Sequence, residues 1–174
     1  IHGLVVTFLG FASEDDKYAT GRVDYAFAPN CDIIGQVREA RAHSDIVICS
    51  VHWGVEFVPH PAADEEALGR AIIDAGADLV LGHHPHVVRR VERYKRGLIA
   101  YSLGNFVFDM LWNPALRTGL VLRVTLSRQG IERFATELVW IGDDYQPRQM
   151  SHAQTAAASL AFESLQRRPD WVSE

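Results

Sequence analysis

The chain has few cysteines, no long apolar run and no surplus of positive charge. Its two cysteines, Cys31 and Cys49, form neither a disulfide framework nor the CxxC pair of a zinc knuckle. No stretch reaches the roughly 18 consecutive apolar residues of a membrane span. The formal net charge is −5, and the basic residues are scattered among acidic ones. A nucleic-acid partner is therefore not expected.

The composition is that of an ordinary globular domain. The 174 residues are 48% hydrophobic and 22% charged, which is enough to build one domain with a real core. Cys49 lies within the apolar run 45–51, so we expect a buried thiol. The first residue is Ile1 and no signal peptide is visible, so we expect a fragment of a longer protein, or a chain trimmed at its start, that is itself soluble.

The first half of the chain alternates between strand and helix patterns. Apolar runs and helical spacings predict elements over 4–9, 33–43 with Asp32 as N-cap, 45–51, 63–75 and 78–81. Strands joined by helices are normally parallel, with right-handed crossovers. The order therefore predicts a parallel sheet.

The second half predicts antiparallel structure. Two hairpins are expected, over 88–102 and 118–141, followed by a helix over about 152–165. The expected fold class is α/β in the broad sense (α+β). We expect one domain over residues 1–150, followed by a helix and tail over 151–174.

Histidines follow two of the predicted parallel strands. His52 follows the strand 45–51, and Gly82–His86 places three histidines directly after the strand 78–81. Parallel strands end at the same edge of a sheet, and neutral imidazole is a common metal ligand. The pattern therefore predicts a metal site formed by His52, His83 and His86, with His84 as a further candidate that is expected to point aside.

Other polar residues surround these histidines in the sequence. Glu56 is a candidate catalytic group, and its alternatives are a metal ligand, a residue that orients ligands or an ordinary loop acid. Asn105 is a second catalytic candidate, and Ser102, Asn105 and Asp109 are candidates for binding substrate or orienting ligands. The alternative for these three is a polar turn between hairpins.

Three motifs resemble the bacterial capsule-synthesis (CapA-like, poly-γ-glutamate biosynthesis) family. They are Ser50–Glu56, Ile73–Val87 and Tyr101–Asp109, in the family's order. That family is similar to the calcineurin-like metallophosphoesterases. The resemblance covers residues 3–150 and implies the C-terminal half of an αββα sandwich with β-hairpins and a terminal helix.

The resemblance also implies a metal chemistry. In the superfamily the last motifs are a lone histidine after a strand, matched by His52, and a Gly-His-x-His turn. Gly82-His83 and His86 match that turn with one inserted residue. The early motifs, Asp-x-His, Gly-Asp and Gly-Asn-His-Asp/Glu, are absent, and Gly104-Asn105-Phe106 is a false match. Two divalent ions (Zn, Mn or Fe) are implied for the complete domain and at most one for this chain.

The implied function is a metal-dependent, phosphohydrolase-like role in capsule or poly-γ-glutamate biosynthesis at the bacterial cell envelope. Its partners would be an anionic polymer or a phosphoester substrate and the missing N-terminal half of the domain. No residue of the sequence indicates whether the bond that is cleaved would be a phosphoester or an amide. The alternative is a non-catalytic accessory protein that binds or exports an anionic capsule polymer.

Overall fold

The computed structural model describes residues 3–12 and 32–166. Residues 1–2, 13–31 (which include Cys31) and 167–174 lie outside the described residues. Within the described part the predicted elements are present, and the fold is the expected mixture of α and β structure.

A five-stranded sheet lies at the centre of the fold, in the order β1-β2-β3-β5-β4. Its strands are β1 (Val6–Ala12), β2 (Ile46–His52), β3 (Leu79–His83), β4 (Val91–Tyr94) and β5 (Gly97–Ala100). Strands β1, β2, β3 and β5 are parallel, and β4 pairs antiparallel with β5. The predicted parallel sheet is therefore confirmed. The first predicted hairpin is formed by β4 and β5, and its strand β4 lies at one edge of this sheet.

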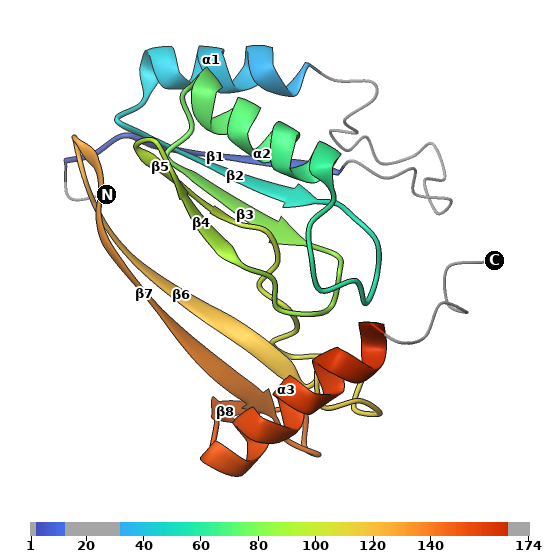
Figure 1. Ribbon diagram of the computed structural model, residues 1–174. Helices are drawn as coiled ribbons and strands as arrows, with labels where there is room; N and C mark the ends of the chain where they lie inside the picture. The colour runs from blue at the N-terminus through green and yellow to red at the C-terminus, as the bar shows by residue number, and fades with distance from the viewer. Residues whose placement is uncertain (1–2, 13–31, 167–174) are drawn as a thin grey trace, which may run out of the picture.

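Two helices cover one face of this sheet (Figure 1). α1 (Ile33–His43) begins where Asp32 Oδ1 accepts a hydrogen bond from the Gly35 amide at 2.8 Å, as the N-cap prediction required. α2 (Ala63–Ala75) carries three acidic residues in its first turn, which suits the positive end of the helix dipole. Val47, Cys49 and Val51 of β2 are fully buried under these helices, in the principal apolar core.

A second, antiparallel sheet covers part of the other face. It consists of β6 (Thr118–Ser127), β7 (Gly130–Ile141) and the short β8 (Pro147–Gln149), which the sequence did not predict. Ile131 of β7 packs with Leu79 and Leu98 of the central sheet. The layers are therefore helix, sheet, sheet (Figure 1).

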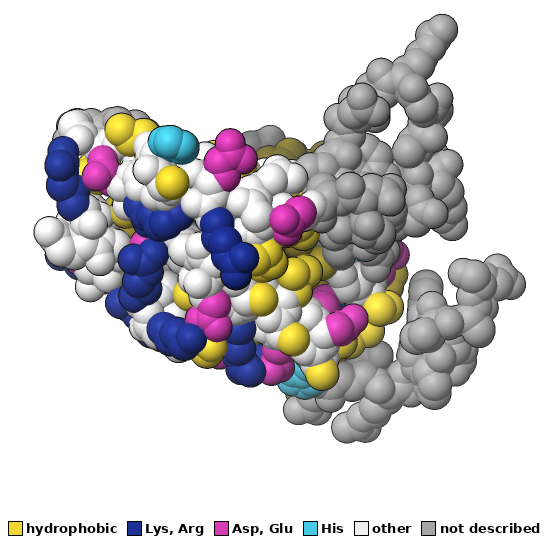
Figure 2. Space-filling model, turned by 90° about the horizontal axis from the view of Figure 1, so that it is seen from above, with side chains coloured by type: hydrophobic (Ala, Val, Ile, Leu, Met, Phe, Trp, Pro, Cys, Tyr) yellow, Lys and Arg dark blue, Asp and Glu magenta, His cyan; other side chains and the backbone are white. Residues whose placement is uncertain are grey.

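The last helix, α3 (His152–Gln166), lies near the loops beyond the carboxyl ends of the parallel strands (Figure 1). Its Ala161 packs against Val87, Ala115 and Leu116. None of the helices in the described ranges is long and apolar enough to cross a membrane. On the helix-covered face, Lys and Arg side chains lie interspersed with Asp and Glu (Figure 2).

Candidate metal centre

The ends of β2 and β3 form the base of the candidate site. The two strands are parallel neighbours, and His52 pairs in register with His83. Side chains alternate between the faces of a strand. His52 and His83 therefore belong to the face opposite the buried Val51 and Gly82. The expected convergence of the two strand ends is confirmed.

Gly82, at the start of the histidine turn, lets the backbone pass close to Trp53 and Tyr101. A Cβ at this position would lie 2.2 Å from the Tyr101 carbonyl oxygen and 2.5 Å from Trp53 Nε1. Those two atoms are themselves hydrogen-bonded, since the buried Trp53 indole donates to the Tyr101 carbonyl at 2.9 Å. A side chain at residue 82 would separate them, so the start of the turn is fixed by packing.

The turn itself has an unusual backbone conformation. His84 has φ +100° and His86 has φ +58°, and Phe57 in the facing loop has φ +65°. Non-glycine residues in this region cost on the order of 1–3 kcal/mol each and cluster at functional sites. The Phe57 amide donates to the Pro85 carbonyl at 2.9 Å, which ties the loop to the turn.

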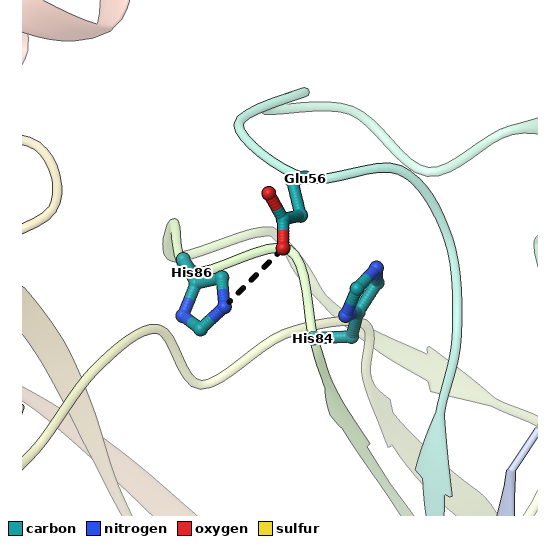
Figure 3. A group of neighbouring side chains, drawn as sticks. All are labelled: Glu56, His84 and His86. Carbon is teal, nitrogen blue, oxygen red and sulfur yellow. Dashed lines mark ion pairs between the residues drawn. The ribbon is translucent and has the colours of Figure 1, made fainter. Parts of the chain in front are cut away.

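Three side chains from these two segments converge (Figure 3). The potential ligand atoms of Glu56, His84 and His86 all lie within 4.8 Å of one another. His86 Nε2 is 3.9 Å from Glu56 Oε1. The ring of His52 lies beside that of His84, with centroids 4.5 Å apart. Donors around tetrahedral Zn²⁺ lie about 3.4 Å apart, given Zn–N bonds of ~2.1 Å, so modest side-chain rotations would close this group on a cation.

His84, rather than His83, is the partner that the structure places beside His86. His83 is half-buried, and burial lowers its pKa. It is outside the group formed by Glu56, His84 and His86. The spacing contained a signal for this arrangement, because His84-Pro85-His86 fits a His-x-His turn without an inserted residue.

Asn105 fixes the orientation of His86. Its side chain is 5% exposed, its Nδ2 donates to the Leu116 carbonyl at 2.9 Å, and its Oδ1 lies 2.8 Å from His86 Nδ1. Because Nδ2 is committed as a donor, Oδ1 must accept, so His86 Nδ1 carries a proton. In the neutral imidazole, Nε2 then has a free lone pair.

That lone pair faces a carboxylate. Nε2 of His86 and Oε1 of Glu56 would both be acceptors across 3.9 Å. Two acceptors that face each other at this distance are satisfied by a bridging donor or cation, such as a water molecule or a metal ion. Backbone geometry, tautomer and donor types therefore all suit a two-histidine, one-carboxylate site, a set that binds Zn²⁺ or Fe²⁺ in other proteins.

The other predicted polar residues lie differently. Ser102 is 1% exposed, and its Oγ accepts from the Gly104 amide at 3.2 Å. Asp109 is exposed. Neither belongs to the group of potential ligands in the described part of the chain. Roles for Ser102, Asn105 and Asp109 in substrate binding remain predictions.

Aromatic side chains surround the histidines. The ring of Phe108 lies 4.9 Å from that of His86, and Phe57 packs edge-on against Trp112 at 5.8 Å. Phe106 and Trp112 are more than half exposed. The candidate centre is therefore an accessible group of donors within an apolar rim.

Comparison with known proteins agrees with the sequence resemblance. Residues 3–110 match the model of the family described as bacterial capsule synthesis protein PGA_cap. This match covers more than half of the chain. The chain belongs to the bacterial capsule synthesis protein family. Glu56, His84, His86 and Asn105 all lie within the matched residues.

Named relatives in this family include two proteins from Bacillus. The chain is 38% identical over 131 residues to "Capsule biosynthesis protein CapA" of Bacillus anthracis, covering 70% of this chain and 31% of the relative. It is 37% identical over 137 residues to "PGA biosynthesis protein CapA" of Bacillus subtilis (strain 168), covering 77% and 36%. The chain thus spans about a third of the length of these relatives.

A third family relative has a different kind of name. The "Probable polyglutamine synthesis accessory protein" of Mycobacterium tuberculosis is 37% identical over 78 residues, which cover 45% of this chain and 20% of the relative. In contrast to the Bacillus names, this name describes an accessory role.

Proposed function

We propose that this chain contributes a divalent-cation site to a metal-dependent, hydrolase-like protein of capsule polymer biosynthesis. Glu56, His84 and His86 would hold the cation, with His52 and His83 as adjacent candidates. The observation that carries the proposal is the convergence of three potential ligand atoms within 4.8 Å. The hydrogen bond between His86 Nδ1 and Asn105 supports it, because it leaves Nε2 of His86 available to a metal. The capsule role is supported by the family and by the names of the Bacillus relatives.

A divalent cation bound by such residues would supply Lewis-acid polarisation of a substrate oxygen. The chain's own residues would prepare the site. Asn105 would keep the proton of His86 on Nδ1, and the strained turn would present His84 and His86 to the same point. Glu56, with a side chain 46% exposed, would leave a bound cation open to substrate.

The substrate is proposed only at the level of chemical class. An anionic polymer of the poly-γ-glutamate type or a phosphoester would each bring negatively charged oxygens to a bound cation. The family and the names of the relatives favour the polymer. We propose that the complete protein acts at the cell envelope, where such a polymer is assembled, and that the remaining portion of the domain supplies ligands for a second metal ion.

The second candidate is a non-catalytic accessory protein that binds or exports the anionic polymer. The name of the Mycobacterium relative favours it. In this case the cation would bind carboxylates of the polymer without breaking a bond.

Metal binding tests what both candidates share. Titration calorimetry of the metal-free chain with Zn²⁺ and Mn²⁺ should give one site, which Glu56→Ala, His84→Ala or His86→Ala removes or weakens at least tenfold. His43→Ala, an exposed histidine of α1, is the matched control and should leave affinity unchanged. Unchanged metal binding in all three site variants would refute the proposed centre.

Turnover separates the two candidates. A protein extended to the length of its relatives should hydrolyse a phosphodiester or a poly-γ-glutamate chain in a metal-dependent way if it is a hydrolase. Metal-dependent polymer binding without chain cleavage would instead support the accessory role. The 174-residue chain by itself should show weak turnover or none.

A further inference from the structure

Arg89 is a buried cation behind the candidate centre. It follows His86 by three residues and is 3% exposed, an uncommon position for a charged side chain. Its charge is compensated by Glu65 of α2, which is 7% exposed and lies 2.8 Å from Arg89 Nη1. Burial lowers the pKa of Arg89, and the hydrogen bond to Glu65 opposes that effect.

The remaining donors of Arg89 reach the loop that carries Glu56. Nε donates to the Val58 carbonyl at 2.7 Å and Nη2 to the Val55 carbonyl at 3.1 Å. These two carbonyls stand on either side of Glu56 and Phe57 in the sequence. One planar guanidinium therefore holds both ends of a two-residue segment, a geometry that lysine cannot reproduce with its single ammonium.

The same loop lies directly on the ion pair. Gly54 has φ +85°, and a Cβ there would lie 1.8 Å from Glu65 Oε1 and 2.8 Å from Arg89 Nη1. Glu65 also accepts a hydrogen bond from the Ala62 amide, at the end of the loop. The Arg89–Glu65 pair thus lies close against the loop at Gly54 and holds it by hydrogen bonds at Val55, Val58 and Ala62.

We infer that Arg89, neutralised by Glu65, is a positioning residue that sets the Glu56 carboxylate against His86. This inference rests on the proposed metal site and adds a residue that touches none of its ligand atoms. Arg89 holds the backbone that carries Glu56, and the hydrogen bond from the Phe57 amide to the Pro85 carbonyl completes the alignment with the turn.

A double-mutant cycle in metal affinity tests this role. Arg89→Lys should weaken Zn²⁺ binding by about tenfold to a hundredfold, the range found when groups that orient metal ligands are removed. In a Glu56→Gln background, Arg89→Lys should have almost no further effect on Zn²⁺ affinity, because the carboxylate through which Arg89 acts on the metal has already been removed. An equal loss in both backgrounds would show that Arg89 only supports the fold, and would overturn the inference.

Arg90→Lys is the matched control. Arg90 is the neighbouring residue, and its guanidinium is exposed and pairs with Glu66 on the surface. The Arg90→Lys substitution should leave Zn²⁺ affinity unchanged. If Arg89→Lys does not fold, Glu65→Gln replaces it in the same cycle. That variant keeps the volume and removes the charge, and it should again weaken binding only when Glu56 is intact.

A metal-free measurement keeps this inference separable from the proposed function. Hydrogen exchange of the Phe57 amide should speed up in Arg89→Lys and stay as in the wild type in Arg90→Lys. Should the wild-type chain bind no metal, the proposed function fails, and the exchange rates still decide whether Arg89 holds the loop. Unchanged Phe57 exchange in Arg89→Lys would refute the positioning role on its own.

Discussion

Replacing Asn105 should separate the stability of the fold from the affinity of the metal site. Asn105→Ala removes the acceptor of His86 Nδ1 and leaves the Leu116 carbonyl without its donor. Each group that loses its partner costs about 1–3 kcal/mol, so for these two groups we expect the free energy of unfolding to fall by about 2–6 kcal/mol. Because His86 is no longer held, Zn²⁺ affinity should fall about tenfold to a hundredfold.

Asn105→Asp distinguishes the two effects. The carboxylate can still accept from His86 Nδ1, so Zn²⁺ affinity should stay within about threefold of the wild type or improve. It cannot donate to Leu116, so stability should still fall by about 1–3 kcal/mol. Urea unfolding gives the stability, and calorimetric titration with Zn²⁺ gives the affinity.

The control for this experiment is another asparagine of the same segment. Asn113 Oδ1 accepts from the Ala115 amide at 2.8 Å, a contact that does not involve His86. Asn113→Ala should lower stability by about 1 kcal/mol and leave Zn²⁺ affinity unchanged. Wild-type affinity in Asn105→Ala, with the chain folded, would refute the argument that this amide prepares His86 as a ligand.

Three further predictions concern the scaffold of the site. His84→Gly should be more stable than His84→Ala by about 1 kcal/mol in urea unfolding, because φ +100° suits glycine, and equal stabilities would contradict the strained turn. Gly82→Ala should cost about 1–3 kcal/mol or prevent folding, since its Cβ meets the Tyr101 carbonyl, and a wild-type melting temperature would contradict that packing. Burial raises the pKa of Cys49 to about 12, so the thiol stays protonated at pH 9. In a Cys31→Ser background, Cys49 should therefore resist a thiol reagent at pH 9 until urea unfolds the chain. Rapid labelling of the folded chain would contradict this.

Much of the architecture could be predicted from the sequence. The apolar runs over 45–51 and 78–81, joined by a helical pattern, fixed the parallel arrangement of β2 and β3, because a strand, helix and strand have one favoured crossover. That arrangement was enough to bring His52 to the same edge as the histidine turn. The hairpins followed from alternating apolar residues around short polar turns.

The details of the site depended on tertiary contacts. His84 and His86 share a direction because of positive φ angles in the turn, which no hydrophobic periodicity reveals. The sequence left several roles open for Glu56. Its approach to His86 depends on the conformation of its loop, which Arg89 holds from another part of the chain. Arg89 resembles an ordinary surface arginine in the sequence, and only packing against α2 makes it a buried cation. The three-residue β8 was too short to be detected.

The most direct test of the central claim is to locate a bound metal ion. Crystals of the chain grown or soaked with Zn²⁺ should show an anomalous difference peak between Glu56, His84 and His86, with His86 coordinating through Nε2 and keeping Nδ1 on Asn105. A map without a peak at this position, or with the ion bound elsewhere while these three side chains stay apart, would contradict the account.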